Sequence, residues 1–209
     1  MQLIRQVFQS IVVPPAEGFG SVSTNLPRVK QTELLTPTEL MGLLHRQEND
    51  IGIKAAAQAV EICFNMTTVF RAEVLGAILN QILEEPTLPT IFMRTVIRSV
   101  ERYRSLSTYV AGSLLTRLIT KKIWLEPPLW KGFIICARKT APASYAALSV
   151  LPKEQIKDIA AHHPDLRAGL QEFFTRRVGS NPARLNGIME LLGEVAPISS
   201  TPSTPLQTS

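Results

Sequence analysis

Residues 68–104 read TVFRAEVLGAILNQILEEPTLPTIFMRTVIRSVERYR. Apolar side chains recur every three or four residues up to Glu84, and the same spacing returns after Leu88. This spacing places apolar side chains on one face of a helix, whereas a strand would need alternation every second residue. Pro86 and Pro89 lie between the two stripes, where proline ends one helix and starts the next. The stretch therefore predicts two helices joined by a short loop.

The helical pattern continues in both directions along the chain. Upstream, residues 36–39 (TPTE) combine a hydroxyl cap, a proline and an acidic first turn, and helical spacing follows again over residues 50–64. Downstream, residues 108–123 and the segment after Pro127 keep the same spacing. Further prolines predict later helix starts near positions 142, 152, 164 and 182. We predict an all-α fold.

The spacing of the helix starts predicts how the helices are arranged. Proline-led starts near residues 37, 89, 127 and 164 are each about two helices apart. Short connections make successive helices antiparallel, and such pairs bury their apolar faces on their neighbours. We therefore predict a HEAT-like stack of antiparallel helical hairpins, with an irregular helical bundle as the alternative.

Composition divides the chain into three parts. Residues 1–33 contain an N-terminal segment and a linker rich in proline, glycine and serine. Residues 34–195 form the predicted helical domain. Residues 196–209 are rich in serine, threonine and proline and almost uncharged, which predicts a disordered tail.

Several classes of protein fit the composition poorly. The opening residues lack signal-peptide features, and no apolar run approaches the ~20 residues that span a bilayer. Cys63 and Cys136 both lie in apolar helical patterns, which favours buried free thiols over a disulfide. We expect a soluble intracellular protein that does not contact a membrane.

The sequence offers little catalytic chemistry. His45, His162 and His163 fall near predicted helix ends, where histidines are usually structural or exposed. No zinc-like ligand spacing, phosphate-binding loop or nucleophile motif is present. We therefore expect no enzyme activity, no cofactor, no metal and no small-molecule substrate. A hydrolase or transferase on a helical fold remains a minor alternative without a nucleophile–base pair to support it.

Positive charge is concentrated in one part of the chain, although the net charge is only +5. Residues 90–140 hold ten cations and two acids. Arg94, Arg98 and Arg102 follow one another at four-residue spacing, so they share one helix face where like charges repel. A second group, Lys121, Lys122 and Trp124, precedes the turn before Pro127. We interpret these six residues as a candidate partner-binding surface.

Two alternatives to a protein-binding surface remain open. The cations could form a solvated face whose long stems cover apolar surface. They could also grip the phosphates of RNA, which would make the chain a helical-repeat RNA-binding module. Stacking of bases on exposed aromatic side chains would support RNA binding, and Tyr103 and Tyr109 lie near the cations.

Residues 84–156 carry a resemblance to a known family. The most specific pieces are LPTIFMRTVI at 88–97, LITKKIW at 118–124 and PLWKGFI at 128–134. These closely resemble the C-terminal domain of symplekin, and the similarity covers residues 34–192. The resemblance implies a HEAT-like nuclear scaffold for pre-mRNA 3′-end cleavage and polyadenylation. It also implies binding to the C-terminal domains of the endonuclease subunit and of its inactive paralogue. Family members are much longer, so this chain resembles their C-terminal part.

Overall fold

A computed structural model describes residues 6–8, 12, 35–176, 187, 190, 192 and 193. These residues form helices and connecting turns, and their one β-type contact is an isolated bridge between Val12 and Leu35. The all-α prediction is confirmed. Val12 is buried in the same core as the helices, so this residue of the N-terminal segment packs on the domain. The predicted helix start at Pro182 and the tail 196–209 lie outside the described residues.

The helical elements follow one another with short connections. In chain order they are α2 (Pro37–Arg46), α3 (Glu48–Ile51), α4 (Ile53–Phe64), α5 (Ala72–Leu83), α6 (Phe92–Arg102), η2 (Arg104–Leu106), α7 (Ser107–Tyr109), η3 (Val110–Leu114), α8 (Leu115–Thr120), η4 (Ile123–Leu125), α9 (Pro127–Lys139), α10 (Tyr145–Leu148), α11 (Lys153–His162) and α12 (Pro164–Arg176).

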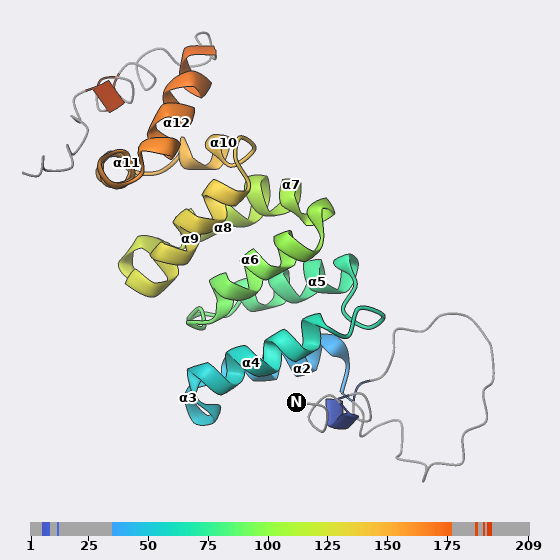
Figure 1. Ribbon diagram of the computed structural model, residues 1–209. Helices are drawn as coiled ribbons and strands as arrows, with labels where there is room; N and C mark the ends of the chain where they lie inside the picture. Colours follow the sequence, from blue (N-terminus) through green and yellow to red (C-terminus); the bar gives the residue numbers. More distant parts are fainter. Residues whose placement is uncertain are drawn as a thin grey trace, which may run out of the picture.

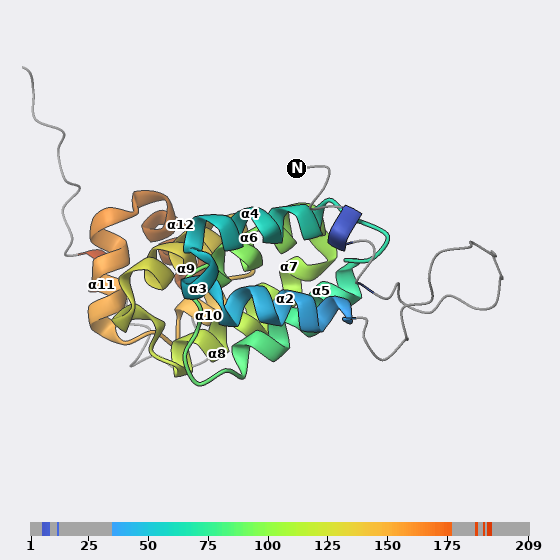
Figure 2. The same ribbon diagram turned by 90° about the horizontal axis from the view of Figure 1, so that it is seen from below.

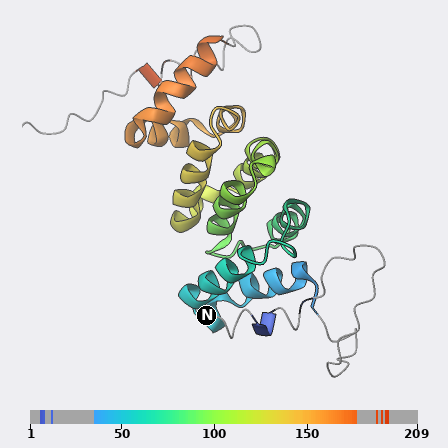
Figure 3. The same cartoon turned by 45° about the vertical axis from the view of Figure 1, so that its right-hand side comes forward.

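The helices stack as successive antiparallel hairpins (Figure 1). Seen from below, most of them fall into two rows: α2, α5 and α8 form one, and α4, α6 and α9 form the other, while α11 runs across the end of the stack (Figure 2). Within the rows α2 packs on α5, and α6 packs on α9. Figure 3 shows the stack extending from α2 at one end to α12 at the other. The arrangement is the HEAT-like hairpin stack that the proline spacing predicts.

Two predicted helices are interrupted in the structure. The helix predicted over 50–64 is divided at Gly52, whose φ of 90° is a conformation that favours glycine. The helix predicted over 108–123 contains a π-helical segment, η3, between α7 and α8. It ends at Thr120, two residues before Lys122, which has a left-handed φ of 55°. Neither interruption changes the order in which the hairpins follow one another.

Buried polar contacts fix the start of α6 against the first hairpin. Ile91, at the N-cap of α6, has an apolar side chain that cannot cap the helix. Glu48 of α3 takes this role, because its carboxylate accepts hydrogen bonds from the backbone N–H of Thr90 (2.6 Å) and of Ile91 (3.0 Å). The negative carboxylate also complements the positive end of the helix dipole. A residue more than 40 positions upstream therefore caps α6.

His45 makes the second contact between the first hairpin and α6. Its Nδ1 lies 2.7 Å from the Met41 carbonyl and its Nε2 lies 2.9 Å from Thr95 Oγ1. Because a carbonyl only accepts, Nδ1–H donates to it, and in the neutral ring Nε2 accepts from the Thr95 hydroxyl. Burial lowers the pKa of His45, although the Met41 carbonyl and the charge of Glu48 oppose this shift. His45 is therefore a neutral residue of the core rather than a cation at a helix end.

We expect the stability of the domain to fall as the pH drops below the ordinary histidine pKa of 6.5. Below the ordinary histidine pKa of 6.5, the unfolded chain takes up a proton that buried His45 resists. The free energy of unfolding then drops by up to about 1.4 kcal/mol per pH unit until the folded-state pKa is reached. Urea unfolding of the wild type and of His45→Gln checks this, since the variant should show a flatter pH dependence. His162→Gln, which replaces an exposed histidine at the end of α11, serves as the comparison variant.

Candidate partner-binding surface

Helix α6 presents its cations on the face opposite its buried side chains. Phe92, Val96 and Ser99 are buried against neighbouring helices, whereas Arg94 and Arg102 are exposed and Arg98 is half-buried. Eight residues separate Arg94 from Arg102, which places them about 12 Å apart along the helix axis. The predicted arginine face therefore exists, but its two ends belong to different regions of the surface.

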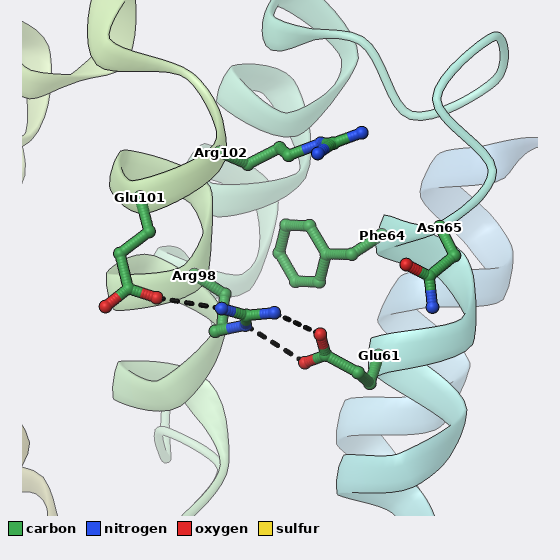
Figure 4. Close-up of a pocket in the computed structure, with 6 residues that line it drawn as sticks. All are labelled: Glu61, Phe64, Asn65, Arg98, Glu101 and Arg102. Carbon is green, nitrogen blue, oxygen red and sulfur yellow. Dashed lines mark hydrogen bonds and ion pairs between the residues drawn. The ribbon is translucent and has the colours of Figure 1, made fainter.

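Arg98 links α6 to α4, although its side chain remains 43% exposed. Its guanidinium forms an ion pair with Glu61 of α4 through two nitrogens and donates to Glu101 of its own helix at 2.9 Å (Figure 4). These two carboxylates raise the pKa of the arginine further above its usual range. The repulsion expected from the arginine spacing is thereby offset by acids that flank the central member of the series.

A surface groove crosses α6 at the end that carries Arg102. One pocket of about 180 Å³ lies between α4 and α6, and a second of about 470 Å³ lies between α6 and α9. Glu101 lines both, so the two pockets adjoin each other. The residues that line the groove are Glu61, Phe64, Asn65, Arg98, Val100, Glu101, Arg102, Arg104, Ser107 and Lys139. We call this feature the α6 groove.

The charges in the α6 groove are unequally compensated. Glu101 accepts from Lys139 Nζ at 2.7 Å as well as from Arg98, and these bonds lower its pKa. Arg102 and Arg104 form no ion pair within the described part of the chain, and both are exposed. The groove therefore combines a neutralised centre with two cations available to a ligand.

Lys121, Lys122 and Trp124 lie at a corner between α8 and α9. The Lys121 ammonium donates to the backbone carbonyl of Glu85 at 2.8 Å, which brings this corner next to the loop that precedes α6. Trp124 packs partly on the core, whereas the neighbouring Leu125 is 67% exposed. The corner and Arg94 thus share the edge of the stack where α5 meets α6 and α8 meets α9. We call this feature the loop edge.

The structure compensates part of the positive charge of residues 90–140. Acids from other helices or from outside the basic stretch pair with Arg98, Arg117 and Arg138. Within residues 90–140, the exposed cations that have no ion pair among the described residues are Arg94, Arg102, Arg104, Lys121, Lys122 and Lys131. The sequence showed which cations are present, but it did not show that Glu61, Glu84 and Asp165 would reach them.

The nearby aromatic side chains are engaged in packing. The Tyr103 hydroxyl donates to the Phe70 carbonyl at 2.9 Å, and the Tyr109 hydroxyl donates to Asn80 at 2.7 Å. Trp130 stacks on Phe133 with ring centroids 5.2 Å apart. All three rings are partly buried against the core, which disfavours the stacking of bases on them.

Neither a metal site nor a membrane span is found in the described part of the chain. Its histidine, cysteine and acidic side chains form no group of three or more that could hold a metal. Its helices are all too short or too polar to cross a membrane. Burial raises the pKa of Cys63 and of Cys136 to about 12, which makes both thiols poor nucleophiles.

A family model places the chain among known proteins. The model described as "Symplekin tight junction protein C terminal" matches residues 1–163, which includes the N-terminal segment and ends just before α12. No solved structure matches the chain significantly. The family provides scaffolds in mRNA 3′-end processing and is generally non-catalytic. Because the match covers most of its 209 residues, the chain belongs to the symplekin C-terminal family.

Proposed function

We propose that this domain is a non-catalytic nuclear scaffold that binds the C-terminal domains of the 3′-end endonuclease subunit and of its inactive paralogue. The family match over residues 1–163 carries this proposal. The stacked hairpins support it, because a preformed surface binds a partner without first losing much conformational entropy. Within the described residues, every buried side-chain nitrogen and oxygen has a hydrogen-bond partner, as expected of a rigid platform.

The loop edge is the proposed contact region for these partners. It combines exposed cations, Arg94 and Lys122, with the apolar surface of Leu125 beside Trp124. Apolar anchors surrounded by charges are typical of protein interfaces, in which the charges favour complementary partners. Arg98 contributes indirectly, since it positions α6 through Glu61. Arg102 lies at the far end of α6, in the α6 groove.

Charge reversal at the loop edge tests this assignment. We expect Arg94→Glu with Lys122→Glu to weaken binding of the two nuclease-family domains at least tenfold, because two favourable charges become repulsive. Isothermal titration calorimetry with the purified domains measures the change. Lys54→Glu with Lys157→Glu is the matched control, since both lysines are exposed and lie on other helices. Equal affinities for the two double variants would refute the loop edge as the contact region.

RNA binding is the competing function, and the same preparations test it. Exposed cations favour it, whereas the packed aromatic rings and the paired cations disfavour it. A phosphate-gripping module would bind RNA with an affinity that falls steeply as salt rises. If the domain fails to bind the nuclease-family domains but binds single-stranded RNA in this way, the scaffold proposal is wrong.

A further inference from the structure

We propose that the α6 groove is a second docking site, which binds an extended acidic peptide segment of a partner protein. The inference deepens the proposed scaffold function, because a scaffold with two separate surfaces can hold two protein segments at once. It rests on the uncompensated cations of the groove, on the neutralised centre between them and on its shape.

The positive potential of the groove comes from Arg102 and Arg104. The other two cations that line it, Arg98 and Lys139, are already paired with Glu61 and Glu101. In Figure 4 the Arg102 side chain extends across the upper side of the pocket, away from the Arg98–Glu61 pair. Its guanidinium is thus free to form a bidentate pair with a carboxylate of a ligand.

The floor and walls of the groove favour a peptide over a nucleic acid. The Phe64 ring lies between Arg98 and Arg102 at the base of the smaller pocket and is only 4% exposed, so it closes the pocket from below (Figure 4). Asn65 and Ser107 add hydrogen-bonding groups at the two ends of the groove. Glu61 and Glu101 neutralise Arg98 and Lys139, so the centre of the groove offers no net positive charge to a continuous row of phosphates. A peptide can instead place neutral residues there and acidic ones beside the two arginines.

The position of the two pockets on either side of Glu101 explains why the ligand should be extended. The groove starts at α4, passes over α6 and reaches Lys139 of α9, so it crosses the helices of one row. A compact ligand would occupy one pocket, whereas an extended chain can contact Arg102 in one and Arg104 in the other. The exposure of both arginines predicts moderate affinity that weakens as salt screens their charges.

NMR titration of the ¹⁵N-labelled chain with a synthetic peptide tests the proposal. The probe is a short peptide in which glutamates flank a central leucine, and its glutamine analogue is the neutral comparison. We expect saturable shift changes at residues 64, 65, 102 and 104, with at least tenfold weaker binding for Arg102→Gln with Arg104→Gln. The Lys54→Gln with Lys157→Gln variant, which removes the same charge elsewhere, should bind as the wild type does.

Three results would overturn the proposal. These are no saturable binding, equal weakening in both double variants, and shift changes that the glutamine analogue reproduces. Preferential binding of single-stranded RNA at the same residues would assign the groove to nucleic acid instead. The titration contains no nuclease-family domain, so a negative result would not contradict the loop-edge proposal. A negative result in the loop-edge experiment would likewise not contradict the α6 groove proposal.

Discussion

Replacing Glu48 by alanine is expected to lower the free energy of unfolding by about 3 kcal/mol. The Glu48 side chain is 4% exposed and accepts from the N–H groups of Thr90 and Ile91. Hydrogen bonds to a charged acceptor contribute about 1.5–3 kcal/mol each. Removing the carboxylate also removes the free-energy cost of burying its charge, which offsets part of the lost hydrogen bonds. Alanine would leave two N–H groups at the start of α6 without their acceptor. Urea denaturation at pH 7 measures the change.

Two variants separate the capping role of Glu48 from a general effect of charge. Glu48→Gln keeps one acceptor oxygen, so its loss of stability should be intermediate. Asp50→Ala removes an exposed acid from the same short helix and should change stability by less than about 0.5 kcal/mol. If Glu48→Ala were no more destabilising than Asp50→Ala, the α6 cap would contribute little to the fold.

The helices were predictable because their signals are local. At the start of α2, Thr36 and Glu39 form the reciprocal hydrogen bonds of a capping box, and the sequence contains both residues at the required spacing. Pro127 similarly marks the start of α9. The cap of α6 was not predictable, since Glu48 lies in a different hairpin and nothing near Ile91 points to it. The division at Gly52 does have a sequence signal, because a glycine within a helical pattern can mark an interruption. The regular apolar spacing around Gly52 nevertheless favoured one uninterrupted helix.

The sequence predicted which cations lie on the candidate surface, but it did not predict which side chains of other helices contact them. The four-residue spacing of Arg94, Arg98 and Arg102 placed them on one face, as found. Their separate roles depend on contacts between helices: Arg98 meets Glu61, whereas Arg102 lines a pocket. Such contacts depend on how hairpins stack, and one sequence contains no direct record of that. The six predicted surface residues remain a proposal, now divided between the loop edge and the α6 groove.

The approach of α6 to α9 depends on Gly132, a glycine in the middle of a helix that no sequence pattern marks as a contact point. A Cβ atom placed on Gly132 of α9 would lie 2.5 Å from the Cβ of Met93 on α6, and Met93 is 2% exposed. Real Cβ atoms essentially never come so close. Because the near atom is the Cβ of Met93, rotation of the methionine side chain cannot relieve the overlap. Any larger residue at position 132 therefore has to push the two helices apart.

We expect Gly132→Val to lower the free energy of unfolding by about 3 kcal/mol, at the upper end of the usual effect of overpacking. Gly132→Ala should cost less, about 1 kcal/mol, because the higher helix propensity of alanine offsets part of the clash. The matched control is Gly112→Ala, where an added Cβ would meet nothing within 4 Å and stability should stay the same or rise. Thermal and urea unfolding of the three variants give the comparison.

The same substitution connects the core to the surface. Separating α6 from α9 would pull Glu101 away from Lys139, and this ion pair lies between the two pockets of the α6 groove. Gly132→Val should therefore also weaken binding of the acidic peptide, under conditions where the variant is still fully folded, while Gly112→Ala leaves it unchanged. If the valine variant were destabilised but bound the peptide normally, the groove would not depend on the close packing of α6 on α9.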